Sequence, residues 1–221
     1  MPVRRTQLAC PVLEVAPRLL GRVLRRTTEE GTVAVRITEV EAYDGPNDPG
    51  SHAFRGETAR NAVMFGPAGF LYVYFTYGMH YCMNVSVGPD GRPSAVLFRA
   101  GEVIEGVELA RARRGTVAPV VEKFNSALPT KRRVRNPDWD LARGPARLCV
   151  ALGISSREPN GTDLLSPKSA VRLLPGEGFD GVPSTGPRVG LREAADNPWR
   201  FWIPGDPTVS QYKPHVPKRR A

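Results

Sequence analysis

Few residues in this chain of 221 carry the chemistry of disulfide-rich or metal-binding proteins. The three cysteines, Cys10, Cys82 and Cys149, are odd in number and far apart, so they predict neither a disulfide framework nor a zinc site. The three histidines add no metal-ligand spacing. We therefore expect a protein of the reducing cytoplasm that uses no metal and no cofactor.

Long apolar runs are also missing. No segment approaches the length of a transmembrane helix, and the N-terminus has no apolar signal core, so we expect no membrane partner. Neither an internal repeat nor a clean linker is present. The economical prediction is a single domain over residues 1–221, with residues 212–221 forming a disordered basic tail.

Lysine is scarce, whereas arginine is abundant. Of the 31 lysine and arginine residues only five are lysines, and the basic residues exceed the 22 acidic ones to give a net charge of +9. Such a basic chain favours a polyanion such as nucleic acid as its partner, which would associate it with the nucleoid. Arginine also suits phosphate contacts and stacking on aromatic rings better than lysine does.

The hydrophobic pattern predicts an α+β fold: a single domain on a curved, mainly antiparallel sheet, with a protruding β-hairpin and flanking helices. The strands should be short because Pro/Gly turns separate the alternating segments. The predicted strands are residues 23–26, 32–43, 71–76, 83–87, 94–99, 170–174, 188–191 and 200–203, and the predicted helices lie within residues 1–21, 102–114 and 144–153.

The most aromatic stretch is the predicted hairpin at residues 70–84. Alternation places one face of its first strand in the core and makes the other a shelf of tyrosines that includes Tyr72 and Tyr74. At the turn, Tyr77 and Met79 should protrude. An ordinary half-buried hairpin explains this pattern too. In a strongly basic chain, however, an aromatic tip favours a surface that stacks unpaired bases and separates base steps.

The strand at residues 32–43 contains a conflict. One face of this strand carries, in order, Val33, Val35, Ile37, Glu39, Glu41 and Tyr43. An apolar row therefore runs into two carboxylates. Either the strand leaves the core at Glu39, or a carboxylate is aimed into a semi-buried cavity, where it can serve as a general base. The turn-rich loop that follows is long enough to be functional.

Seven blocks of sequence stand in a distinctive order. They are Glu39-Val40-Glu41-Ala42-Tyr43, Ser51-His52-Ala53, Arg60-Asn61, Met64-Phe65, residues 71–84, Leu97-Phe98-Arg99-Ala100 and Gly144-Pro145-Ala146-Arg147-Leu148-Cys149. In this order and spacing, the blocks resemble the alkyladenine (3-methyladenine) DNA glycosylase family from about Leu19 to Ser210. The Tyr-Gly-Met-x-x-Cys-Met-Asn motif of the hairpin makes the resemblance specific.

The resemblance implies a DNA glycosylase of base excision repair. Such an enzyme flips an alkylated purine out of duplex DNA and hydrolyses its N-glycosidic bond with an activated water. The implied substrates are 3-methyladenine and 7-methylguanine, with hypoxanthine and ethenoadenine as further candidates. The residues that match the family's site are Glu41 (general base) and Arg99 for catalysis, Tyr43, His52, Tyr74 and Asn84 for the base pocket, and Tyr77 and Met79 for the DNA wedge.

The sequence also bears on the mechanism. A glycosylase with lyase activity needs an amine nucleophile, and none of the five lysines lies in the matched blocks, so we expect a monofunctional enzyme. Glu39 matches no catalytic position and is expected to be a structural carboxylate. His80 and the segment 192–199 depart from the family's pattern, which leaves the substrate range open. The expected partner is double-stranded DNA with damaged purines, bound by a monomer.

Three other functions are compatible with parts of the pattern. A non-catalytic minor-groove binder of distorted DNA would share the wedge and the charge but would not need Glu41. An RNA-binding or tRNA-modifying protein could use the same tyrosine shelf. A carbohydrate hydrolase could use Glu39 and Glu41 as a carboxylate pair, because residues two apart on a strand lie roughly 7 Å from each other.

Overall fold

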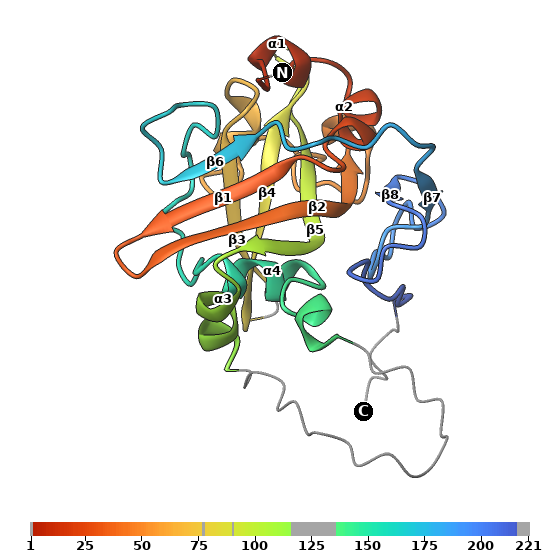
Figure 1. Cartoon of the computed structure of the whole chain (residues 1–221). Coiled ribbons are helices and arrows are strands. Elements are labelled where there is room, and N and C mark those ends of the chain that lie inside the picture. Colours follow the sequence, from red (N-terminus) through yellow and green to blue (C-terminus); the bar gives the residue numbers. More distant parts are fainter. Residues whose placement is uncertain (1, 77, 90, 116–135, 216–221) are drawn as a thin grey trace, which may run out of the picture.

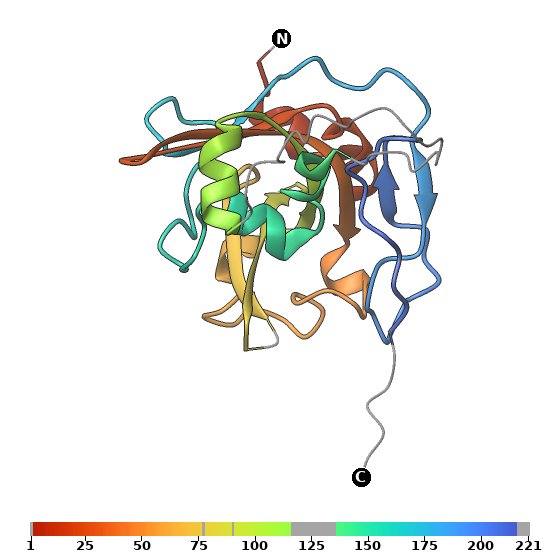
Figure 2. The same ribbon diagram turned by 60° about the horizontal axis from the view of Figure 1, so that its bottom comes forward.

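The computed structural model describes residues 2–76, 78–89, 91–115 and 136–215. These residues form a single α+β domain on a curled antiparallel sheet, as the sequence predicts (Figure 1). The main path of the sheet has the strand order β3-β4-β5-β2-β1-β6, and β8 pairs with both β2 and β7 beside it. Figure 2 shows the β3–β4 hairpin reaching away from the rest of the sheet.

The strands alternate with few helices. The strands are β1 (Val23–Thr28), β2 (Gly31–Tyr43), β3 (Leu71–Thr76), β4 (His80–Val87), β5 (Ser94–Glu105), β6 (Val171–Leu174), β7 (Ser184–Gly186) and β8 (Arg200–Trp202). The helices are α1 (Arg5–Leu8), α2 (Val12–Arg18), α3 (Val107–Arg114) and α4 (Pro145–Ala151), with short 3-10 turns at Gly45–Asn47, Ala62–Phe65 and Pro137–Asp140.

One predicted element is wrong at its start, and another is wrong altogether. The helix predicted at residues 102–114 begins only at α3, because β5 keeps pairing with β2 as far as Glu105 and Gly106 then turns the chain in a left-handed conformation. The strand predicted at residues 188–191 is a loop, and the strand of this region is β7 instead. The backbone amide of Val189 is bonded to a side chain rather than to a neighbouring strand.

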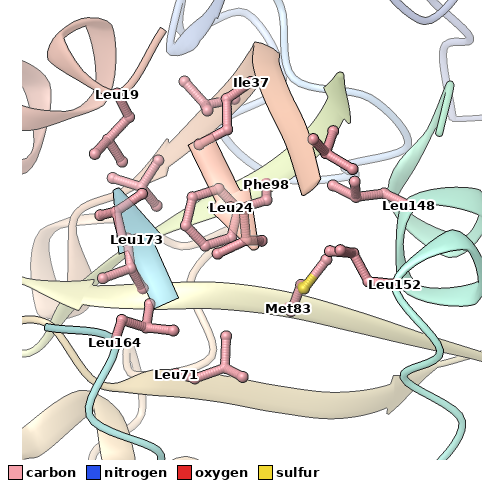
Figure 3. Close-up of a cluster of buried hydrophobic side chains, with 14 of the residues drawn as sticks. Leu19, Leu24, Ile37, Leu71, Met83, Phe98, Leu148, Leu152, Leu164 and Leu173 are labelled. Atoms are coloured by element: carbon pink, nitrogen blue, oxygen red, sulfur yellow. The ribbon is translucent and has the colours of Figure 1, made fainter. Parts of the chain in front are cut away.

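The hydrophobic core fills the concave side of the curled sheet (Figure 3). Side chains from six strands meet there, and α4 and the end of α2 cover them from either side. The labelled members are Leu19, Leu24, Ile37, Leu71, Met83, Phe98, Leu148, Leu152, Leu164 and Leu173, and all of them are buried. Burial of this kind supplies most of the driving force for folding.

The sheet is irregular where β2 passes β5. The register shifts on both sides of Glu39, which leaves first Thr38 on β2 and then Arg99 on β5 as the extra residue of a β-bulge. The core-facing row of β2 therefore changes parity, and after the bulge it continues with Val40 and Ala42. The prediction that both glutamates share the face of the apolar row is wrong, because the bulge breaks the alternation. Glu41 faces a cavity instead.

Candidate active site

A cavity of about 370 Å³ opens beside this irregular part of the sheet. Strands β2 to β5 supply most of its wall, and loops near residues 50 and 190 complete it. The lining residues are Glu41, Tyr43, Gly50, His52, Met64, Tyr72, Tyr74, Thr76, Cys82, Asn84, Ala95, Leu97, Arg99, Pro145, Val189, Gly190 and Leu191. The cavity thus brings together all six residues that the sequence predicts for catalysis and for the base pocket.

Glu41 is fully buried and held at both carboxylate oxygens. The hydroxyl of Tyr43 donates to Oε2 at 2.8 Å, and the backbone amide of Val189 donates to Oε1 at 2.7 Å. Nη1 of Arg99 lies 3.3 Å from the same Oε1. These contacts fix the orientation of the carboxylate in the cavity wall, which a general base requires.

The two groups beside Glu41 keep their protons. Burial, and then the Glu41 charge, raise the pKa of Tyr43 well above its ordinary value, so its hydroxyl stays a donor at neutral pH. Burial alone would lower the pKa of Arg99, but the charges of Glu41 and Glu39 outweigh it and raise that pKa. Arg99 therefore remains a fixed positive charge between two carboxylates.

Glu39 has a different environment from Glu41. Its carboxylate is fully buried and accepts hydrogen bonds from Nε of Arg99 at 2.8 Å and from Nε of Arg200 at 2.6 Å. Ser210 donates to it twice, from its amide at 2.6 Å and its hydroxyl at 2.9 Å. Glu39 does not line the cavity. These four hydrogen bonds agree with the expectation of a structural carboxylate and disfavour a catalytic pair with Glu41.

Aromatic rings form one side of the cavity. The rings of His52 and Tyr74 meet edge to face at 4.6 Å between centroids, and Tyr72 lies 5.5 Å from Tyr74. Nδ1 of His52 is 2.9 Å from the Tyr72 hydroxyl. Burial against these rings, and then the charge of Arg60, lower the pKa of His52 to about 4, so the imidazole is neutral at physiological pH.

The cavity floor and the hairpin tip hold the remaining predicted residues. Asn84 is buried and donates from Nδ2 to the carbonyl of Tyr72 at 3.2 Å. Met79 projects from the tip with 69% of its surface exposed, as the sequence predicts for a wedge. Tyr77 lies outside the described residues, as do residues 116–135 and the last part of the predicted tail, residues 216–221.

Two parts of the site were missed by sequence reasoning. The loop of Val189 and Leu191 was predicted as a strand, although the Pro/Gly residues around it were a signal for a loop. Cys82, which lines the cavity, was used only as part of the hairpin motif and was given no place in the predicted pocket. Burial raises the pKa of this thiol to about 11.

A second cavity of about 520 Å³ adjoins the first, and Arg99, Pro145 and Val189 line both. Its other lining residues include the basic side chains of Arg143, Arg147 and Lys213. Within the described ranges, no cluster of three or more His, Cys, Asp or Glu side chains has the arrangement of a metal site. The helices in these ranges are all too short or too polar to span a membrane.

The fold and the site together define a class of protein. It is a single-domain α+β protein whose cavity has aromatic walls suited to a flat ring, with an oriented carboxylate and an arginine at one side. Residues 6–207 match the family model described as methylpurine-DNA glycosylase. The chain belongs to the methylpurine-DNA glycosylase family.

Relatives cover nearly the whole chain. A protein of Streptomyces avermitilis is 54% identical in an alignment of 226 positions, which covers 99% of this chain and 95% of the relative. A protein of Leifsonia xyli subsp. xyli is 53% identical, over 92% of this chain and 89% of the relative. Both carry the name "Putative 3-methyladenine DNA glycosylase". The resemblance found in the sequence is therefore confirmed at the level of the family.

Proposed function

We propose that this chain releases 3-methyladenine from DNA as a glycosylase of base excision repair, with a water molecule activated by Glu41. The observation that carries the proposal is the Glu41 carboxylate, buried and held at both oxygens in the wall of an aromatic cavity. The volume of the cavity is typical of sites for small ligands, which run from about 300 to 1,000 Å³. Family membership and the names of the relatives support the same activity.

The aromatic walls account for the choice of base. A purine alkylated at a ring nitrogen carries a positive charge, and the faces of tyrosine rings attract positive charge. Tyr43, Tyr74 and the neutral imidazole of His52 line the cavity where such a base would stack. Since the base inside a duplex is out of reach, the nucleotide must first be flipped out of the stack.

The reaction is then a hydrolysis at C1′ of the sugar. Glu41 accepts a proton from water as the water oxygen bonds to C1′ and the C1′–N bond breaks. The electron pair of the broken bond leaves with the base, which neutralises the alkylated ring. Arg99 holds the carboxylates in place and adds positive charge next to the water and the nucleotide's phosphate.

The range of substrates follows from the cavity floor. We propose 7-methylguanine as a second substrate, with hypoxanthine and ethenoadenine as further candidates. Asn84 would crowd the exocyclic amine of guanine, because its side chain is buried and bonded to the backbone of β3. 7-Methylguanine carries the same amine, but its positive charge makes it a better leaving group, and normal guanine lacks that charge. A duplex with an unmodified G·C pair should therefore be a poor substrate.

We propose that double-stranded DNA with a damaged purine binds around the hairpin of a monomeric protein. Tyr77 and Met79 are the proposed wedge that fills the gap left by the flipped nucleotide. The basic second cavity beside Arg99 suits backbone phosphates close to the reacting sugar. Truncating Tyr77 to alanine should slow single-turnover release from duplex DNA, and an unchanged rate would remove it from this role.

We propose hydrolysis without lyase activity. A Schiff base with the sugar requires an amine, and the described residues that line the cavity include no lysine. Borohydride added during the reaction should therefore trap no covalent protein–DNA adduct. A trapped adduct would overturn the hydrolytic assignment.

The direct test is release of free base. Duplex DNA containing 3-methyladenine, incubated with the protein in EDTA, should release the base. Glu41→Gln should keep its affinity for the duplex and lose release by about 10²–10⁴-fold, the usual contribution of a general base. Glu14→Gln, on the exposed surface of α2, is the matched control and should release base normally.

The same experiment separates the main alternative. A non-catalytic minor-groove binder would bind the damaged duplex and release nothing, and Glu41→Gln would then change neither property. The buried position of Glu41 disfavours this alternative, because a binder gains nothing from a desolvated carboxylate aimed into its cavity.

A further inference from the structure

A buried ion pair lies directly behind the cavity wall. The guanidinium of Arg188 forks onto the carboxylate of Asp48, with Nη2 2.7 Å from Oδ1, and both side chains are completely enclosed. Nη1 of Arg188 also donates to the carbonyl of Ala42 at 2.9 Å. Neither Arg188 nor Asp48 lines the cavity. The mechanism above uses neither of them.

This pair touches the groups that orient Glu41. The residue after Arg188 is Val189, whose amide donates to Oε1 of Glu41. The guanidinium carbon lies 4.6 Å from the ring centroid of Tyr43, whose hydroxyl donates to Oε2. Buried ion pairs are costly to desolvate, so a pair at this place calls for a role beyond stability.

The guanidinium of Arg188 lies over two aromatic rings. It stacks on Tyr43 and, at 5.0 Å, on Trp199. Tyr43 lines the cavity and Arg188 does not, so the guanidinium acts on a ring of the cavity wall without lining the cavity itself. A cation over the ring draws π-electron density toward itself, which weakens the attraction of the ring for the positive charge of a bound base.

We infer that Arg188 sets the charge selectivity of the cavity: it limits the preference for a cationic base over a neutral one by placing its own positive charge over the Tyr43 ring. This inference rests on the proposed glycosylase function. Asp48 reduces the effect but does not reverse it, because the guanidinium is the group in contact with the ring.

The test replaces both charges at once, since Arg188→Met alone would leave Asp48 charged and unpaired in the interior. Two neutral pairs, D48N/R188M and D48N/R188Q, are compared with the unaltered protein in single-turnover release from duplexes with 7-methylguanine (cationic) or hypoxanthine (neutral). The different leaving-group abilities of the two bases cancel when the ratio of rates is compared between proteins. The ratio of cationic to neutral release should rise roughly two- to fivefold, the size of one cation–π contact.

A matched pair far from the cavity serves as the control. Arg36 and Asp206 form an ion pair whose other hydrogen-bonded partners do not line the cavity, so R36M/D206N should leave the ratio unchanged. Arg188→Lys keeps a positive charge over the ring and should also keep the ratio, although both rates fall. If a neutral base is released too slowly to time, competition binding of the two duplexes in an E41Q background gives the same comparison.

The outcomes are distinguishable. Equal loss of both activities in D48N/R188M and D48N/R188Q would mean that the pair is only structural and would overturn the inference, while leaving the glycosylase assignment intact. Failure of the unaltered protein to release any base would instead overturn the proposed function itself.

Discussion

The two glutamates of β2 offer the sharpest test of the site. They are two residues apart, and we expect substitution of Glu39 to reduce mainly stability and substitution of Glu41 to reduce mainly base release. Glu39 holds three groups from distant parts of the chain with four hydrogen bonds, two of them from buried arginines. Glu39→Gln would remove the negative charge that both Arg99 and Arg200 contact in the protein interior. Removing one partner of a buried pair costs about 3–5 kcal/mol of unfolding free energy.

Glu41→Gln should cost much less, about 1 kcal/mol. Its two hydrogen-bond donors, the Tyr43 hydroxyl and the Val189 amide, are neutral. The ion pair of Glu41 with Arg99 is long, at 3.3 Å, and Arg99 keeps its 2.8 Å hydrogen bond to Glu39 when Glu41 is neutralised. A glutamine can still accept from the amide with its oxygen, and the hydroxyl can rotate to accept from its NH₂ group. The expected order of destabilisation is therefore the reverse of the expected order of catalytic loss per folded molecule.

The unfolding free energy is measured by urea denaturation followed by circular dichroism, and the melting temperature by heating in the same instrument. For a protein of this size about 1 kcal/mol shifts Tm by 2–4 °C, so Glu39→Gln should melt roughly 6–20 °C lower. Glu14→Gln, whose carboxylate forms an exposed pair with Arg18, should change the unfolding free energy by no more than about 0.5 kcal/mol. This account of the site would be refuted if Glu39→Gln lowered the unfolding free energy by less than about 1 kcal/mol, or if Glu41→Gln lowered it by more than Glu39→Gln does.

Three further predictions concern single groups. In an NMR titration the His52 ring should protonate near pH 4, so the stability that its neutral form contributes is complete above about pH 6.5 and is lost as the pH falls toward 4; a midpoint near 6.5 would contradict this. Gly101→Ala should destabilise the protein by about 1–3 kcal/mol in urea, because its Cβ would lie 2.4 Å from a backbone carbonyl at the bulge, whereas Gly66→Ala, with no atom closer than 3.6 Å, should be near neutral. A thiol reagent at pH 8 should label the partly exposed Cys10 well before Cys82, whose pKa is raised by burial to about 11, and equal rates would argue against that burial.

The hairpin shows where local pattern was sufficient. Alternation along residues 71–76 predicted that Tyr72 and Tyr74 share a face, and both line the cavity. The rule works here because the strand pairs with β4 without a register shift, so the period of two is kept. Only Phe75, at the outer end, departs from the predicted core face, since the core does not extend that far.

The strand β2 shows where local pattern failed. The alternation of residues 32–43 does not predict a bulge, because an extra residue is defined only by how the strand pairs with its partner. Thr38 and Arg99 become extra residues through pairing between segments about sixty positions apart. That pairing turns Glu41 away from the core and into the cavity.

The sequence alone determined the family, six of the residues that line the cavity, and an antiparallel α+β sheet, because those depend on residue identity, order and the two-residue period of a strand. The tertiary structure alone decided which groups surround each of the two glutamates. Partners at Arg200 and Ser210, more than 160 positions along the chain, bind Glu39, while Val189 and Tyr43 orient Glu41 toward the cavity. Contacts across such distances are set by how the whole sheet curls, and no short stretch of residues encodes them.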